Sequence, residues 1–174
     1  MRNKFLQFFA ILLGLYTVQS FALPDDQDQP IYISADSASI NDNTGITTYK
    51  GNVVIKQGSL LIEAAHVEMY RGDEGVEKLI AEGSPAHFRQ KPQPDDPYSD
   101  AWGKNMIYLV NTRKLTITEQ AKVVQDKDTF TGEKIVYDLD RSIVDAFGST
   151  GDNENSSSGR VNMIIQPKKN KADK

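Results

Sequence analysis

The side chains that most often carry out catalysis are sparse in this chain. Histidine occurs twice, as His66 and His87, and cysteine is absent. His66 alternates outward within a predicted strand, and His87 directly follows Pro85-Ala86. The sequence holds no Gly-x-Ser-x-Gly elbow, no His-x-x-x-His pair and no glycine-rich phosphate loop. It therefore predicts no enzyme, no catalytic residue, no metal site and no cofactor.

Two alternatives for chemistry at the surface stay open. The acidic pairs Asp25-Asp26 and Asp95-Asp96 lie beside prolines and are typical of solvated loops, but a glycosidase needs only two carboxylates brought together by folding. Trp102 and Tyr98 could stack on sugar rings, which would make the chain a passive scaffold or a glycan-binding β-module. Such a pair can equally pack under a loop, so ligand contacts at these two side chains alone would favour the module.

The apolar side chains follow a fourfold internal repeat. Its first copy reads Ile33-x-Ala35-x-x-Ala38-x-Ile40, and the other copies begin at Ile62, Ala101 and Phe130. The second copy starts 29 residues after the first, and this pair of copies recurs after 68 residues. Repetition at a fixed period indicates stacked supersecondary units, each too small to bury its own apolar face.

Period-two alternation predicts that each unit is a β-strand. Within a copy, the third and sixth positions are an odd number of residues apart, so a flat strand would send them to opposite faces. A bend would return both to one interior, and the small residues Ala35, Ala64, Gly103 and Gly132 suit a tight corner. The predicted fold is all-β: a single elongated, bent β-jelly-roll of stacked antiparallel strands, with an apolar interior open at both ends. Strands are expected at 31–40, 46–49, 51–57, 60–70, 76–81, 86–90, 101–110, 115–124, 129–139, 142–147 and 160–166.

The inward apolar row has two interpretations. It can fill an ordinary core, or it can line a trough for a long apolar ligand. The single narrow row on each strand and the lack of capping helices favour a trough. The residues expected to line it are Ile31, Ile33, Ile40, Val53, Ile55, Ile62, Val67, Met69, Phe88, Met106, Tyr108, Leu115, Ile117, Phe130, Ile135 and Tyr137.

The first 22 residues have the pattern of a cleavable signal peptide. Arg2 and Lys4 precede an apolar stretch that is short for a membrane span, and Ser20-Phe21-Ala22 has the small-x-small form of a cleavage site. A retained anchor is the alternative. The expected divisions are a signal peptide at 1–22, a flexible lead-in at 23–29, one β-domain at 30–167 with a proline-rich loop at 91–98, and a disordered basic tail at 168–174.

The charge and the cysteine content limit the possible partners and the cellular compartment of the protein. The formal net charge is −4, so the chain has no basic field that would attract nucleic acid. An exported chain without cysteine must be stable through burial and strand pairing rather than disulfides. Together with the signal peptide, these features predict a periplasmic protein.

Four segments give the β-domain a family resemblance. They are Tyr49-x-Gly51-Asn52-Val53-x-Ile55-x-Gln57-Gly58, then Ile62-x-Ala64, then Gly83-x-Pro85-Ala86-x-Phe88, and finally Arg160-Val161-x-Met163-Ile164-Ile165-x-Pro167. In this order they resemble the OstA-type β-jelly-roll family, and the likeness covers residues 29–167. The chain departs from the family pattern at Ala65, where an acidic residue such as Asp36 commonly follows the corner.

The resemblance implies a protein that binds lipopolysaccharide through its lipid A moiety and carries it from the inner to the outer membrane. In this family, lipid moves along the apolar groove of a bridge. The bridge forms by head-to-tail self-association and by contact with inner-membrane-anchored and outer-membrane partners of the same fold. Pairing of unlike strand edges propagates an assembly, whereas edges protected by loops and charge would prevent it. The expected edge residues are Ile31, Ile33, Val161, Met163 and Ile165.

Overall fold

The computed structural model describes residues 26–73, 75–149 and 159–167. These residues form ten strands, paired antiparallel in one sheet, and a single turn of 3-10 helix, so the all-β prediction is confirmed. The predicted signal peptide and basic tail lie outside the described residues. The elements are η1(Asp26–Asp28), β1(Tyr32–Ser34), β2(Ser37–Asn41), β3(Ile46–Gln57), β4(Leu60–Gly72), β5(Gly75–Gln90), β6(Ser99–Leu109), β7(Lys114–Gln125), β8(Asp128–Asp138), β9(Ile143–Phe147) and β10(Asn162–Ile164).

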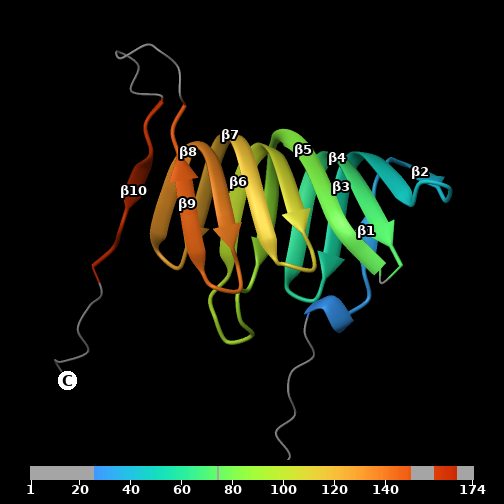
Figure 1. The fold of residues 1–174 in the computed structure, drawn as a ribbon, viewed down its shortest axis with the longest axis horizontal. Coiled ribbons are helices and arrows are strands. Elements are labelled where there is room, and N and C mark those ends of the chain that lie inside the picture. Colours follow the sequence, from blue (N-terminus) through green and yellow to red (C-terminus); the bar gives the residue numbers. More distant parts are fainter. Residues whose placement is uncertain (1–25, 74, 150–158, 168–174) are drawn as a thin grey trace, which may run out of the picture.

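The sheet is a meander folded in half along its length. Strands β3 to β8 are neighbours in sequence order, with β1 and β2 on one edge and β10 and β9 on the other. The pairing register shifts near the middle of the long strands, for example between Glu63 and His66 in β4 and between Trp102 and Asn105 in β6. Because bulges bend strands, these shifts form one corner line where the sheet turns from a first layer into a second. Figure 1 shows the strands arching over along this line.

Each layer contains eight strand segments. The first layer begins with β1 and ends with β10, and the second begins with β2 and ends with β9. These edge strands lie at opposite ends of the molecule (Figure 1), and they do not pair with each other. The sheet is therefore curled but not closed. This agrees with the prediction of an apolar interior that is open at both ends.

Small residues occupy the corner, as predicted. A Cβ atom on Gly103 would lie 2.3 Å from the Cγ2 atom of Ile117, and one on Gly132 would lie 2.7 Å from the carbonyl oxygen of Phe147. Both distances are shorter than van der Waals contact, so the strands can approach this closely only where glycine removes the side chain.

The fourfold sequence repeat is the cross-strand register of the sheet. Ile33, Ile62, Ala101 and Phe130, the first residues of the four copies, lie in one row, each linked to the next through one residue of the intervening strand. The eighth residues of the copies form another row in the second layer. The repeat therefore encodes a stack in which every second strand presents the same side-chain positions to the interior.

Several of the predicted strands have different bounds. The strand predicted at 31–40 divides into β1 and β2, because the corner at Ala35-Asp36 interrupts a strand that has a neighbour on one side only. The strands predicted at 46–49 and 51–57 are one strand, β3, and those predicted at 76–81 and 86–90 are one strand, β5; both are bent at the corner. The last strand is limited to Asn162–Ile164.

Part of the segment predicted as a flexible lead-in is held against the sheet. The carboxylate of Asp26 accepts hydrogen bonds from the backbone N–H of Ser59 at 2.6 Å, from the Ser59 hydroxyl at 2.5 Å and from Nε2 of Gln90 at 2.9 Å. Figure 1 places η1 at the edge opposite the corner, where the turns between strands lie. Within the described ranges, no helix is long and apolar enough to cross a membrane.

Candidate functional site

The folded sheet encloses a continuous apolar interior between its two layers. Phe88 and Tyr108, from different layers, place their ring centroids 5.1 Å apart at an angle of 57°, so the layers are in direct contact. The residues predicted to line a trough that are at most 4% exposed are Val53, Ile55, Ile62, Val67, Met69, Phe88, Met106, Tyr108, Leu115, Ile117, Ile135 and Tyr137. These side chains exclude solvent, so a ligand between the layers would have to separate them.

The other four predicted lining residues lie at the two edges. Ile31 directly precedes β1, Ile33 and Ile40 are in the edge strands β1 and β2, and Phe130 is in β8, which pairs with the edge strands β9 and β10. Ile33 and Phe130 are partly buried and pack against the core. Ile31 and Ile40 are 37% and 63% exposed, so the single chain does not enclose them between its layers. Ile40 nevertheless pairs with Thr47, which is 2% exposed, and directly opposed residues share a face. Its exposure therefore results from the missing neighbour at the edge.

The residues predicted to line the trough do not include several side chains that face inward in the structure. Leu79, Ala101 and Val123 are at most 3% exposed and lie in the same rows as predicted residues. The period of 68 could have identified Val123, since it corresponds to Ile55. The same period would misplace Phe147, the counterpart of Leu79, because Phe147 pairs with Lys134 on the outer face and is 50% exposed.

Polar groups border the interior along the edge opposite the corner. The Tyr108 hydroxyl donates to Oε1 of Gln90 at 3.1 Å, and the hydroxyls of Ser99 and Tyr137 are 2.9 Å apart. Burial raises the pKa of Tyr108 to about 12 and also raises the pKa of Tyr137. Both phenols are therefore neutral hydrogen-bonding groups at physiological pH.

The predicted edge residues lie at the two ends of the molecule. Ile33 is half-buried in β1, whereas Met163 and Ile165 are 53% and 66% exposed at the end formed by β10. Met163 pairs with Phe130, so its side chain is on the inner face. The apolar interior therefore continues to both edges, where apolar side chains meet solvent.

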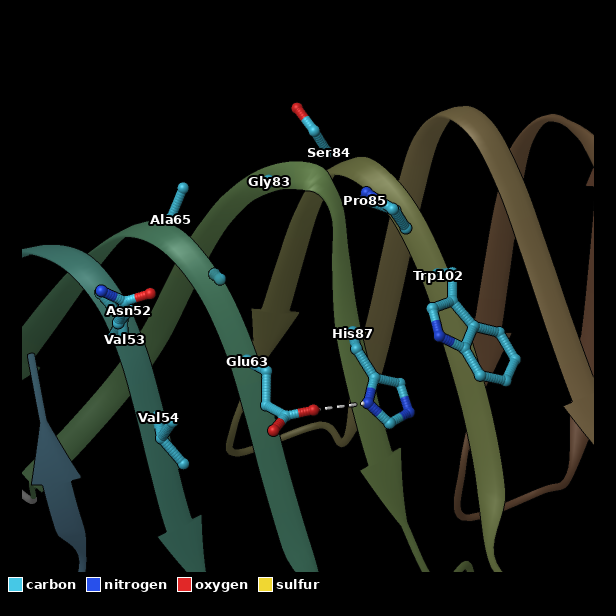
Figure 2. Close-up of a pocket in the computed structure, with 11 residues that line it drawn as sticks. Asn52, Val53, Val54, Glu63, Ala65, Gly83, Ser84, Pro85, His87 and Trp102 are labelled. Atoms are coloured by element: carbon cyan, nitrogen blue, oxygen red, sulfur yellow. Dashed lines mark hydrogen bonds and ion pairs between the residues drawn. The ribbon is translucent and has the colours of Figure 1, made fainter.

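The outer face of the first layer carries a pocket of about 570 Å³ near the corner. Figure 2 shows that Glu63, His87 and Trp102 border it from three neighbouring strands. Nδ1 of His87 lies 3.0 Å from Oε2 of Glu63, and Nε2 lies 2.7 Å from Oδ1 of Asp100. Burial opposes ionisation of Asp100, but hydrogen bonds from Arg89 and His87 hold its pKa below the usual range.

The geometry of the surface aromatics does not favour sugar stacking. The Trp102 ring stacks on His87 with centroids 5.0 Å apart and planes 5° apart. Lys122, on the opposite neighbouring strand, places Nζ 5.1 Å from the same ring. Both faces of the indole are therefore occupied, and a sugar would have to displace one neighbour. Tyr98 has the Arg89 guanidinium 5.3 Å and Lys91 Nζ 5.4 Å from its ring centroid.

The residues considered for catalysis are dispersed. His66 is 3.8 Å from Glu68 on the outer face of the second layer, whereas His87 is on the outer face of the first. Asp26 is engaged with Ser59, and Asp95 and Asp96 lie in the loop between β5 and β6. Among the described residues, no group of three or more potential ligand side chains could hold a metal ion.

Comparison with known proteins relates this architecture to lipopolysaccharide (LPS) export. LptH of Pseudomonas aeruginosa, named as a lipopolysaccharide export system protein, is 40% identical over 162 residues, which is 92% of this chain and 93% of LptH. LptA of Haemophilus influenzae is 33% identical over 150 residues (84% and 86% of the two chains), and LptA of Escherichia coli strain K12 is 29% identical over 153 residues (87% and 78%).

The fold agrees with a solved relative. The crystal structure of LptH, described as the LptA-homologous periplasmic component of the LPS transport device of P. aeruginosa, matches with a TM-score of 0.74 and 41% identity. The match covers 83% of this chain and all of that chain. Residues 32–143 also match the family described as "LptA/(LptD N-terminal domain) LPS transport protein". The chain belongs to this family of LPS transport proteins, as the OstA-type resemblance predicted.

Proposed function

We propose that this protein binds LPS in the periplasm and carries it from the inner to the outer membrane, with the acyl chains of lipid A between the two layers. The observation that carries the proposal is the interior itself, whose inward rows run without interruption from β1 and β2 to β10 and β9. A closed globular core would not need apolar rows that reach two open edges.

The energetics of the cargo fit such an interior. An acyl chain of about a dozen carbons costs roughly 10 kcal/mol to hold in water, at about 0.8 kcal/mol per CH₂. A diffusing LPS molecule would carry this cost for every chain. An apolar interior removes most of it, provided that the sugars and phosphates remain in solvent.

The parity of the sheet supports head-to-tail stacking. Each layer has an even number of antiparallel segments, so its first and last segments run in opposite directions. The β1 strand of one copy could therefore pair antiparallel with β10 of the next, while β2 pairs with β9 in the other layer. Both edges are strands that lack an outer neighbour among the described residues, which makes them templates for pairing.

The register of this junction can be specified. If the rows continue across it, Ile33 opposes Met163 in the first layer and Ile40 opposes Val144 in the second. Ile40 and Met163 would then lose the solvent exposure that they have in the single chain. The inner-membrane-anchored and outer-membrane partners of the family would use the same two edges.

Export through a cleavable signal peptide at 1–22 is part of the proposal. LptH, a relative of this chain, is described as a periplasmic component, and this supports the proposal, as does the amino-acid pattern of the first residues. Cleavage after Ala22 would make Leu23 the mature N-terminus, three residues before Asp26.

The experiment that tests lipid carriage compares adjacent side chains of β1. A photo-reactive amino acid replaces either Ile33, which faces inward with Ile55, or Ser34, which faces outward with Val54. After irradiation of growing Gram-negative cells, the protein is probed for attached LPS. Adducts at position 33 but not at position 34 are expected. No adduct at Ile33 or at a second inward site, Tyr108, in a folded protein would refute the proposal.

A further inference from the structure

The two layers are joined by polar contacts along the edge opposite the corner, which we call the mouth. The Tyr108 hydroxyl, from the second layer, donates to Gln90 of the first. The Ser99 and Tyr137 hydroxyls make a similar contact between β6 and β8. Gln90 and Ser99 are at most 2% exposed, so these contacts are enclosed rather than solvated.

Arg113 crosses the mouth from the turn between β6 and β7. Its Nη2 donates to the carbonyl oxygens of Lys91 and Pro92 at 3.2 and 3.1 Å, at the start of the β5–β6 loop of the first layer. Its Nη1 donates to Oδ1 of Asp140 at 3.0 Å, in the next turn of its own layer. The backbone of Arg113 has a φ of 45°, and its Nε is buried without a hydrogen-bond partner. The guanidinium is thus fixed across the mouth although one donor is unsatisfied.

The segment Asp26–Gln29 makes a third connection between the two layers, in addition to the hydroxyl contacts and Arg113. Nε2 of Gln27 donates to the carbonyl oxygen of Val110 in the second layer at 3.1 Å. Nε2 of Gln57, in the first layer, donates to the carbonyl oxygens of Gln27 and Gln29 at 3.2 and 3.0 Å. Asp26, through Ser59 and Gln90, fixes the start of the same segment. The segment therefore connects the two layers across the mouth.

A carried lipid must cross this line of contacts. Its acyl chains can lie between the layers, but its sugars and phosphates would lose their hydration there. The corner side is closed because the strands of both layers are continuous through it. The mouth is the remaining side along which a polar headgroup can stay in water while the lipid moves lengthwise.

We propose that these contacts form a latch that keeps the mouth closed when the protein is empty and that opens as the lipid headgroup passes. The latch consists of Gln27–Val110, Gln90–Tyr108, Arg113 with the Lys91 and Pro92 carbonyls, and Ser99–Tyr137. This inference rests on the proposed lipid carriage, because it concerns the same interior. Water can replace each of these hydrogen bonds when the latch opens, so polar contacts suit a seam that opens and closes repeatedly.

A reducible cross-link across the mouth tests the latch, since the chain has no cysteine of its own. In the locked protein, Gln27→Cys and Val110→Cys are joined by a short disulfide-containing bis-maleimide. In the control, Lys122→Cys and Thr131→Cys, which are partners on the outer face of one layer, are joined in the same way. Loading of purified, fluorescently labelled LPS is followed before and after reduction of the linker.

The locked protein is expected to load LPS at least tenfold more slowly than its reduced form, while the control loads equally in both forms. Equal loading by the locked and reduced proteins would overturn the latch. If the protein without any cross-link binds no LPS, the proposed function fails instead, so the two failures are distinguishable.

A second pair of variants tests the latch without a linker. Arg113→Gln removes the guanidinium that crosses the mouth, whereas Arg141→Gln removes one that contacts Asp138 within its own turn. Arg113→Gln is expected to load LPS several-fold faster than the unmodified protein, and Arg141→Gln at the unmodified rate. Thermal unfolding establishes that both variants are folded. Loading by folded Arg113→Gln that is no faster than by Arg141→Gln would contradict the latch.

Discussion

Truncation of Phe88 separates the two interpretations of the interior, an ordinary core and a lipid-binding trough. Phe88 is 1% exposed, and its ring contacts Tyr108 across the layers. Phe88→Ala leaves a cavity at the centre of the interior. An ordinary core only loses stability from this change, whereas a trough also gains space that an acyl chain can occupy.

The size of the loss follows from the burial. A fully buried phenylalanine replaced by alanine costs about 3–5 kcal/mol of unfolding free energy, from the lost transfer free energy and the cavity. Trp102→Ala is the matched control, because Trp102 is a large aromatic residue on the outer face of the adjacent strand. It leaves no cavity between the layers, so we expect a loss of about 1–2 kcal/mol from its stacking and cation contacts.

The assay is urea denaturation with and without lipid A dispersed below its aggregation limit. A ligand at 100 times its Kd stabilises the folded state by about 2.7 kcal/mol. Lipid A is expected to protect Phe88→Ala more strongly than the unmodified protein, because the cavity removes part of the work of separating packed side chains. Trp102→Ala should gain the same protection as the unmodified protein. Equal protection of the two variants, or none in either, would refute binding between the layers.

Three further results are expected. Burial raises the pKa of Tyr108 to about 12 from 10.0, so this phenol contributes stability that is complete below pH 10 and is lost as the pH rises to about 12. Tyr108→Phe should therefore remove about 2–3 kcal/mol of the stability loss seen at alkaline pH. A pH profile of unfolding that is unchanged by the substitution would contradict this expectation. Ser34→Cys with Asn162→Cys should give a ladder of disulfide-linked oligomers under oxidation, because the two residues end the same outer row. Ser34→Cys alone should stop at dimers. Absence of the ladder argues against the proposed register between stacked copies. Gly103→Ala places a methyl group 2.3 Å from Ile117 and should cost about 1–3 kcal/mol in unfolding free energy. Calorimetry would measure this loss. An unchanged melting temperature would contradict the tight corner.

The sequence contained the register of the sheet. The residues at equal positions of the fourfold repeat, such as Ile33 and Ile62, could be placed on one inner face because side-chain alternation and a fixed period together determine which face each residue occupies. The odd spacing within each copy predicted the corner, and Gly103 shows why a small residue is needed there. These features depend on neighbours along one strand, so they are readable from the chain.

The contacts at the mouth could not be predicted in this way. Gln27 and Val110 are 83 residues apart, and their contact depends on how far the two layers are folded toward each other. Ser99 and Tyr137 are both buried, but no local pattern indicates that their hydroxyls meet. The acidic composition of the lead-in predicts a flexible segment. It does not reveal the partners of Asp26, because Ser59 and Gln90 belong to a distant turn and strand.

The separation of polar from apolar contacts has a consequence for movement along the molecule. Acyl chains between the layers would meet mainly apolar side chains, so their free energy would vary little with position and no deep trap would form. The polar contacts are confined to the mouth, where each contributes about 0.5–1.5 kcal/mol net. Opening them one at a time costs far less than the roughly 10 kcal/mol needed to expose one acyl chain to water. A lipid would therefore slide lengthwise through successive small barriers, and release into the periplasm would be the rare event.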